Sequence, residues 1–295
     1  MICTLCPRRC GVDRRTEPGF CGERETLRIA RAAPHHWEEP PISGTGGSGT
    51  IFFSGCSLRC VFCQNHEIAV SHIGCDITPE ALADTMLRLQ SEGVHNINLV
   101  TGTHFTPQIV SVLHLAKQRG LSVPIVWNSG GYELPETLRM LDGLVDIYLP
   151  DFKYISADIA AEYSQAPDYP EVAKAALAEM VRQRGTQQFD ADGMMQSGIQ
   201  VRHLVLPGHA QESRKVLYYL WNTYGSRIGI SIMNQYTPMP QCKEHPLLSR
   251  RVTEKEYENV LRYAEQLGIE NAFTQEGEAA AESFIPQWTD SPDQL

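Results

Sequence analysis

The chain has 295 residues, a mass of 33.0 kDa and a formal net charge of -10. Hydrophobic residues make up 42% and charged residues 20%, which excludes global disorder, collagen and coiled coil. The acidic balance argues against a general nucleic-acid or anionic-membrane binder. No run of about 18 apolar residues predicts a transmembrane helix.

Residues 1–25 are rich in Cys, Arg and Gly and show neither a helical nor a strand period. A second irregular stretch, residues 34–49, ends in a Gly/Ser run that lacks the Lys of a phosphate-binding loop. We expect this run to form a loop near the active site. The expected domains are therefore a Cys-rich N-terminal segment with a Gly-rich linker over 1–49, and a second domain over 50–295.

From residue 50 onward, predicted strands and helices alternate. Strands are expected at 50–54, 96–100, 123–127, 145–149, within 198–206, and at 227–233 and 271–274. Helices are expected at 78–92, 106–120, 134–141, 211–224 and 253–267, with a helix-rich stretch over 156–184. Strands that are apolar on both faces, alternating with amphipathic helices, predict a parallel sheet covered by helices. About six such units allow a doubly wound sheet or a partial barrel. In both, the active site lies at the carboxyl ends of the strands.

The cysteines are the unusual feature of the composition. Seven of the nine lie in the first 63 residues, and the first ten residues contain three cysteines and two arginines in place of an apolar leader. A chain this long buries roughly 75% of its unfolded surface and needs no disulfide framework to fold. We therefore expect a cytoplasmic protein. In such a reducing compartment, clustered cysteines usually bind metal.

Three cysteines follow the first predicted strand in the pattern C-x3-C-x2-C, at Cys56, Cys60 and Cys63. Three thiolates in one tight loop can hold three irons of a cubane cluster and leave the fourth iron without a protein ligand. An open metal position is typical of a catalytic site and not of a structural one. The alternative is a closed zinc site with Cys75 as the fourth ligand.

This loop, with Phe62 before the third cysteine, resembles the signature of the radical S-adenosylmethionine (SAM) superfamily. Together with His36-Trp-Glu-Glu-Pro40 and residues 43–49, residues 55–65 are similar to glycyl-radical-enzyme activases, in the branch related to pyruvate formate-lyase activating enzyme. The resemblance implies a partial (β/α)6 barrel, a [4Fe-4S] cluster, reductive cleavage of SAM to a 5′-deoxyadenosyl radical and an anaerobic setting. It also implies an electron donor of flavodoxin or ferredoxin type, with a glycyl radical enzyme, a small molecule or a peptide as substrate. A non-catalytic metal-binding protein is the alternative from a different class.

The resemblance also assigns the SAM-binding residues. Lys153 is expected to pair with the SAM carboxylate, and Asp151 to lie near the SAM ammonium group or a bound cation. Where the family has Gly-Gly-Glu, this chain has Thr101, Gly102 and Thr103, so backbone carbonyls and a hydroxyl replace the missing carboxylate. The remaining expected cofactor contacts come from the cluster loop and the strand ends, and are Phe62, Asn65, Asn128, Ser129, Arg202, Asn234 and Gln235.

Two residues are catalytic candidates. His104 is expected at the end of the second strand, either as a substrate acid/base or as a polar wall residue. Cys242 follows the sixth strand in a Pro-rich loop, where a thiol can quench a substrate radical or simply be buried. Cys75 is expected to be structural.

The four N-terminal cysteines, Cys3, Cys6, Cys10 and Cys21, lie within 19 residues. Four thiolates in a segment without an apolar core predict a closed tetrahedral zinc site, in which metal binding supplies the folding energy. A second iron–sulfur cluster is the rival interpretation, and free thiols are the third.

Overall fold

The computed structural model describes residues 2–269, 272–274 and 288. Over these residues the strands form one sheet in the order β10-β9-β8-β6-β5-β4-β2-β1-β3, and β7 pairs with β8. The strands are β1 Arg28–His35, β2 Ser48–Phe53, β3 Cys75–Asp76, β4 Ile97–Val100, β5 Ile125–Ser129, β6 Ile147–Pro150, β7 Gln188–Phe189, β8 Met195–Leu204, β9 Gly229–Met233 and β10 Phe273–Thr274.

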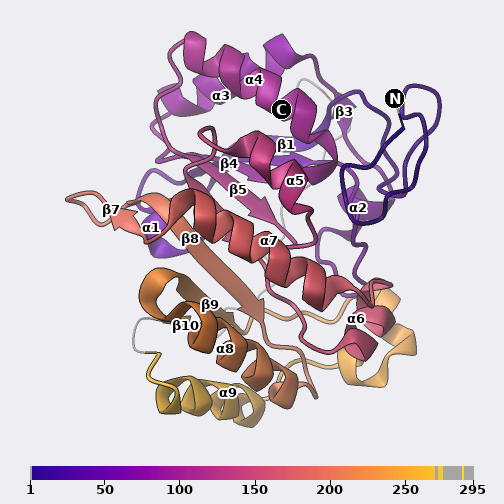
Figure 1. Ribbon diagram of the computed structural model, residues 1–295, viewed down its shortest axis with the longest axis vertical. Coiled ribbons are helices and arrows are strands. Elements are labelled where there is room, and N and C mark those ends of the chain that lie inside the picture. The colour runs from indigo at the N-terminus through magenta and orange to yellow at the C-terminus, as the bar shows by residue number, and fades with distance from the viewer. Residues whose placement is uncertain (1, 270–271, 275–287, 289–295) are drawn as a thin grey trace.

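Helices follow the parallel strands and cover one face of the sheet (Figure 1). The helices are α1 Pro40–Ser43, α2 His66–Val70, α3 Pro79–Ser91, α4 Thr106–Gln118, α5 Pro135–Leu138, α6 Ala157–Ser164, α7 Tyr169–Arg184, α8 Ala210–Tyr224 and α9 Glu254–Gln266. Short 3-10 helices are η1 Thr103–Phe105, η2 Arg139–Leu141, η3 Gly225–Arg227, η4 Pro240–Glu244 and η5 Pro246–Ser249. No helix in this part of the chain is long and apolar enough to cross a membrane.

The βα alternation predicted from the sequence is confirmed. Strands β2, β4, β5, β6, β8 and β9 are parallel neighbours in chain order. The predicted first helix begins where its capping residues place it, because the Thr78 hydroxyl accepts a hydrogen bond from the Ala81 N–H at 3.2 Å and Pro79 occupies the first helical position. Of the last predicted strand, β10 lies within residues 273–274, and residue 271 lies outside the described residues.

The sequence did not predict β1. It pairs antiparallel with β2 and β3, and so joins the main sheet although it belongs to the range 1–49. The division at residue 49 stays a prediction. The expected position of the Gly/Ser run was wrong: it lies at the amino end of β2, where the Gly49 N–H donates to Asn96 O and the His95 N–H to Gly47 O. Because parallel strands share one direction, this run lies at the edge opposite the cysteine loop.

Residues 36–43 lie against the face of the sheet that the helices leave open. Alternate strand residues point to opposite faces, and Ile42 of α1 packs with Val126 of β5 and with Ile147 and Leu149 of β6, whereas Trp127 and Tyr148 belong to the main core. The Asn96 side-chain amide donates to Ile42 O at 2.7 Å. The segment thereby closes the amino end of the inner face.

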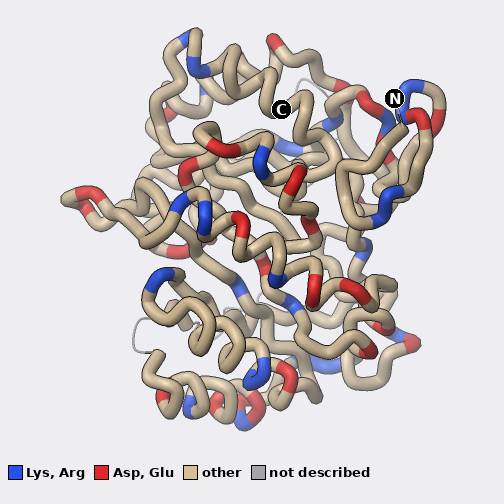
Figure 2. Tube along the Cα trace, viewed as in Figure 1, with Lys and Arg blue, Asp and Glu red and all other residues tan. Residues whose placement is uncertain are grey.

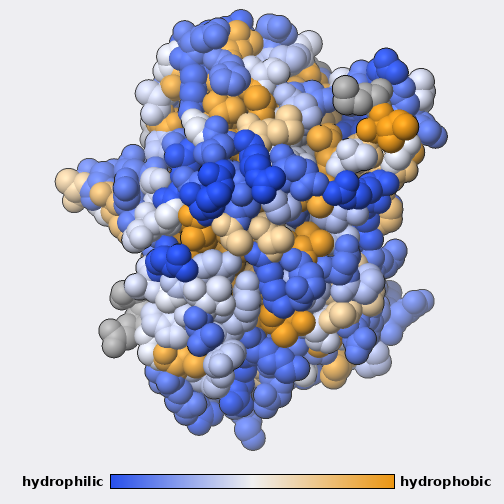
Figure 3. All heavy atoms as spheres, in the orientation of Figure 1, coloured by the Kyte–Doolittle hydropathy of each residue, from blue (hydrophilic) through white to orange (hydrophobic). Residues whose placement is uncertain are grey.

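The outer surface carries no large patch of one charge sign on the face in view. Figure 2 shows Lys and Arg interspersed with Asp and Glu, and Figure 3 shows a mostly hydrophilic surface with scattered apolar side chains. Exposed large apolar residues within the described chain are dispersed through the sequence: Ile2, Trp37, Met140, Phe189, Tyr218 and Leu247. On this face, charged and apolar side chains are therefore mixed, and neither kind gathers into one large patch.

Candidate active site

A cavity of about 210 Å³ opens at the carboxyl ends of the parallel strands. Its wall contains eight residues predicted from the sequence, namely Phe62, Cys63, Asn65, Asn128, Asp151, Lys153, Arg202 and Gln235. The apolar part of the wall includes Phe52, Val100, Leu206 and Met233. The cavity thus brings together side chains from the cysteine loop and from six parallel strands or the segments that follow them.

The cysteine loop, residues 56–63, directly follows β2. Two donors point at its sulfurs: the Leu58 N–H donates to Cys56 Sγ at 3.4 Å, and the Ser164 hydroxyl donates to Cys60 Sγ at 3.0 Å. Burial, together with the nearby thiols of Cys56 and Cys60, raises the pKa of the Cys63 thiol to about 12. Of the three cysteines, Cys63 lines the cavity, and Cys56 and Cys60 lie near it in the same loop.

This donor set suits a cluster better than a single ion. Within the described residues, no three His, Cys, Asp or Glu side chains lie close enough to share one metal ion. Three cysteines that each bind a different iron of a cubane need not share one. Hydrogen bonds to the sulfurs, of the kind that Cys56 and Cys60 accept, tune the reduction potential of such clusters. Cys75 lies on β3, paired with Ile29, and is buried.

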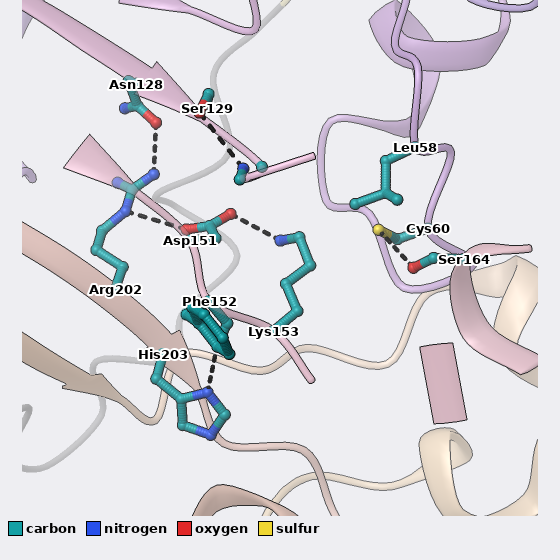
Figure 4. A network of polar contacts seen from close by, with 12 residues as sticks. Leu58, Cys60, Asn128, Ser129, Asp151, Phe152, Lys153, Ser164, Arg202 and His203 are labelled. Carbon is teal, nitrogen blue, oxygen red and sulfur yellow. Dashed lines mark hydrogen bonds and ion pairs between the residues drawn. The ribbon is translucent and has the colours of Figure 1, made fainter. Parts of the chain in front are cut away.

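Asp151 and Lys153 form an ion pair at the end of β6, with 2.7 Å between Lys153 Nζ and Asp151 Oδ2. The lysine side chain extends toward the cysteine loop, and its Nζ lies 5.9 Å from the centre of the Phe62 ring (Figure 4). Burial by itself lowers the pKa of Lys153, but the Asp151 carboxylate outweighs it, so the pKa is raised and the ammonium stays charged.

Arg202 of β8 connects this pair to the interior. Its guanidinium donates to Asp151 Oδ1 at 3.2 Å, to Glu38 Oε2 at 3.0 Å and to Asn128 Oδ1 at 2.6 Å. Burial alone lowers the pKa of Arg202, and the carboxylates of Asp151 and Glu38 reverse the effect. The expected position of Arg202 on the cavity wall agrees with this geometry (Figure 4).

Glu38 and Glu39 are residues whose part in the site was missed from the sequence. Glu38 Oε1 accepts from the side-chain amides of Asn98 at 2.9 Å and Asn128 at 3.4 Å. Glu39 Oε1 accepts from the Ser231 hydroxyl at 2.6 Å, and burial raises its pKa. The two carboxylates precede α1 and enter the inner face from a segment whose irregular sequence has no strand or helix period. The sequence signal that could have indicated them is the pair of adjacent carboxylates in the motif His36-Trp-Glu-Glu-Pro40.

Four of the predicted cofactor residues lie beside the cavity and do not line it. The hydroxyls of Thr103 and Ser129 donate to the buried Glu133 carboxylate, at 2.8 and 2.5 Å. Thr101 and Gly102 directly precede η1. The backbone of Thr101 has φ +61°, a conformation that is strained for a β-branched residue. Backbone strain of this kind concentrates at functional sites. The backbone at Thr101 therefore stays a candidate for SAM binding.

Of the predicted residues after β9, one lines the cavity and two do not. Gln235 lines the cavity, and Asn234 does not. Cys242 is fully buried behind the cysteine loop, where its thiol donates to Val61 O at 3.4 Å. Its predicted role as a radical quencher has no geometric support, because the thiol is not part of the cavity wall.

His104 is also outside the cavity wall. Its Nε2 lies 2.7 Å from the Ser54 carbonyl oxygen, so this nitrogen carries the proton and donates, and Nδ1 is buried without a hydrogen-bond partner in the described structure. Burial, aided by the Arg14 charge, lowers the pKa of His104 to about 3. The ring is thus neutral and built into the wall behind the cavity, and its catalytic role stays a prediction.

The buried neutral ring of His104 should make folding stability depend on pH. An unfolded histidine has a pKa near 6.5, so below that pH the unfolded chain binds a proton that the folded chain excludes. Stability is complete above about pH 6.5 and falls as the pH drops toward 3, by about 1 kcal/mol per pH unit. Urea unfolding at pH 7.5, 6.0 and 5.5 measures this slope. His104→Gln should reduce it by that amount, and an unchanged slope would contradict the assignment.

The four N-terminal cysteines lie near one another on the outside of the cysteine loop. The pKa of Cys6 is raised to about 11, chiefly by burial and also by the nearby thiols of Cys21, Cys3 and Cys10, against a hydrogen bond from the Arg8 N–H that lowers it. A shared metal would require these thiols to turn toward one another, since no three of them now surround one point.

Comparison with known proteins places this geometry in a family. The model of the radical SAM superfamily matches residues 50–187, which include the cysteine loop and Asp151–Lys153. Over 275 residues the chain is 30% identical to the uncharacterized protein MJ0674 of Methanocaldococcus jannaschii, covering 91% of this chain and 75% of that protein. The chain belongs to the radical SAM superfamily.

Other relatives of this superfamily member are more distant. Over 122 residues it is 27% identical to the pyruvate formate-lyase-activating enzyme of Clostridium pasteurianum, covering 40% of this chain and only half of that enzyme. The crystal structure of methylornithine synthase (PylB) matches with a TM-score of 0.51 and 13% identity, over 81% of this chain and 73% of that chain. Streptococcus suis SuiB bound to the precursor peptide SuiA matches with a TM-score of 0.51 and 12% identity, over 76% and 47%.

The two structural matches concern the fold alone. They confirm an α/β fold with a mostly parallel sheet in the form of a radical SAM-like partial barrel. A [4Fe-4S] cluster and SAM are the cofactors typical of the superfamily. The three thiols of the cysteine loop, the donors to two of their sulfurs and the charged cavity beside them fit these two groups.

Proposed function

We propose that this radical SAM enzyme holds a [4Fe-4S] cluster on Cys56, Cys60 and Cys63, and that the cluster with bound SAM supplies a 5′-deoxyadenosyl radical that takes a hydrogen atom from the substrate. The observation that carries the proposal is the common cavity, onto which both the cysteine loop and the Asp151–Lys153 pair open. A non-catalytic metal protein has no need of a charged cavity beside an open thiol set.

In this proposal the chain's own residues bind and orient SAM. Lys153 binds the carboxylate as a point charge, and Asp151 fixes the lysine and faces the ammonium group. Asn128 and Gln235 lie on the cavity wall, where amide groups suit the ribose hydroxyls. The apolar side chains of Phe52, Val100, Leu206 and Met233 exclude water from the reacting groups.

The test is an anaerobic reconstitution of the full chain, followed by counting of iron and sulfide and addition of dithionite and SAM. We expect 5′-deoxyadenosine and methionine from the parent and neither from Cys60→Ala. Cys75→Ala, which removes a cysteine outside the loop, serves as the matched control and should retain the products. Absence of 5′-deoxyadenosine from a cluster-loaded parent would refute the proposal.

For the substrate, we propose a glycyl radical enzyme. The support is the partial similarity to the Clostridium pasteurianum activating enzyme, together with residues 55–65 and 36–40. The deciding measurement is a glycyl-radical EPR signal on a co-encoded candidate enzyme after incubation with SAM and the reduced chain. A small molecule or peptide is the second candidate, and a hydrogen-abstraction product without that signal would favour it.

The proposal also includes an electron donor and a second metal. A flavodoxin or ferredoxin supplies the electron, because a low-potential cluster needs a low-potential donor. The N-terminal cysteines bind a second metal, either zinc or iron–sulfur.

A further inference from the structure

The N-terminal segment, residues 2–25, contacts the cysteine loop directly. The Cys56 N–H donates to the Cys21 carbonyl oxygen at 3.2 Å. Gly55 allows this approach, because a Cβ there would lie 2.8 Å from Cys21 O and 2.5 Å from Glu23 Cγ, and its φ of +81° disfavours other residues. One peptide hydrogen bond thus joins a cysteine of the N-terminal set to the first cysteine of the loop.

Arg8 makes a second connection between the two. Its guanidinium donates to Ser57 O at 2.8 Å in the loop, and to Ser164 O at 3.0 Å and Gln165 O at 2.5 Å at the end of α6. Ser164 is also the residue whose hydroxyl donates to Cys60 Sγ. Arg8 therefore ties the loop to the helix end that supports its second cysteine.

The N-terminal segment has no apolar core of its own to hold Arg8 and Cys21 in place. Among residues 2–25 the buried ones are Cys6, Arg14, Cys21 and Glu23, none of them aliphatic or aromatic. Fixing the backbone costs about 1–2 kcal/mol per residue, so the free energy that orders the segment comes from its contacts with the barrel and from any metal that it binds. Structural metal binding to thiolates supplies on the order of 10 kcal/mol.

The four thiols lie near one another, and binding one metal requires them to turn inward. Gly19 lies between two of them: a Cβ at this position would be 3.3 Å from Cys10 Sγ and 3.5 Å from Cys21 Sγ. Cys6 and Cys21 are buried, and Cys3 and Cys10 are partly exposed. The turn that carries Cys6 is closed by a hydrogen bond from the Arg9 N–H to Cys6 O at 3.0 Å.

We propose that Cys3, Cys6, Cys10 and Cys21 bind one closed metal centre, and that this centre clamps the catalytic cluster loop through the Cys21 carbonyl and Arg8. On metal binding the thiols lose their protons to solvent and the segment becomes ordered. Cys21 and Arg8 act on the loop as positioning residues. The clamping role rests on the proposed cluster at Cys56, Cys60 and Cys63, whereas the metal site does not.

The metal site is tested separately from the cluster. In a full-length chain with Cys56, Cys60 and Cys63 all replaced by Ala, we expect about one zinc or about four irons per chain to remain. Adding Cys6→Ser to that background should remove this metal. Equal metal content with and without Cys6→Ser would overturn the second centre, and would leave the proposed catalytic function untouched.

The clamping role is tested with the three loop cysteines intact. We expect Arg8→Ala and Cys6→Ser to speed iron loss from the catalytic cluster to a chelator by about 10–100-fold, the range typical of changes behind metal ligands. The EPR signal of the reduced cluster should change as well. Arg9→Ala is the matched control, because Arg9 pairs with the exposed Glu136 on the surface. Parental rates and signals in both Arg8→Ala and Cys6→Ser would refute the clamp.

Discussion

Replacing Arg202 with Met should lower the free energy of unfolding by about 3–5 kcal/mol, because the change leaves buried carboxylates without their counterion. Arg202 donates to Asp151, to Glu38 and to Asn128 at distances of 2.6 to 3.2 Å. The side chains of Arg202 and Glu38 are only 15% and 8% exposed, so water solvates the stranded carboxylate poorly. Urea unfolding of the anaerobic parent and variant at pH 7.5 measures the difference.

Two further variants make this result specific. Arg119→Met removes an arginine that pairs with the exposed Asp84, and should cost no more than about 1 kcal/mol. Glu38→Gln combined with Arg202→Met removes one stranded charge and should regain part of the loss. If Arg202→Met and Arg119→Met lower the free energy of unfolding by the same amount, the buried hydrogen bonds of Arg202 do not stabilise the barrel more than a surface ion pair does.

Replacing Lys153 with Met should reduce 5′-deoxyadenosine formation by on the order of 100-fold, chiefly through weaker SAM binding. The ammonium lies at the end of β6 near the cysteine loop, held by Asp151 at 2.7 Å. Its loss removes the charge that we assign to the SAM carboxylate and leaves Asp151 facing the same group. The rate as a function of SAM concentration, measured under dithionite, separates the binding effect from the chemical step.

Lys174→Met is the control for this variant, because Lys174 pairs with Glu171 on the outside of α7. Its rate should equal that of the parent. Iron content should stay at the parental level in both variants, since neither residue is a cluster ligand. A Lys153→Met variant with parental SAM dependence would remove this residue from the proposed SAM site.

Local sequence patterns were sufficient for the parts of the fold that depend on neighbouring residues. The alternation of apolar strands and amphipathic helices predicted the parallel units from β2 to β9. The spacing of Cys56, Cys60 and Cys63 after β2, and the positions of Asp151 and Lys153 after β6, predicted one edge of the sheet as the site. Parallel strands bring their carboxyl ends to the same edge, so residues far apart in sequence meet there.

The tertiary structure alone decided which of the other candidate residues face the cavity. Glu38 enters it from an irregular segment, and its ion pair with Arg202 depends on how residues 36–43 cross the inner face. His104 lies at the expected strand end and Cys242 in the expected loop after β9, yet their side chains are buried behind the wall. A strand end specifies where the backbone is, whereas the direction of a side chain depends on the turn that follows.

The chemistry carried by adjacent residues was therefore determined by the sequence alone: an open three-cysteine loop, a charged pair near it and a four-cysteine segment. Contacts between segments that are distant in sequence were decided by the packing of the chain. The hydrogen bond from Cys56 to Cys21 and the contacts of Arg8 are of this second kind. No spacing or periodicity encodes them, because they form only when the N-terminal segment packs against the completed barrel.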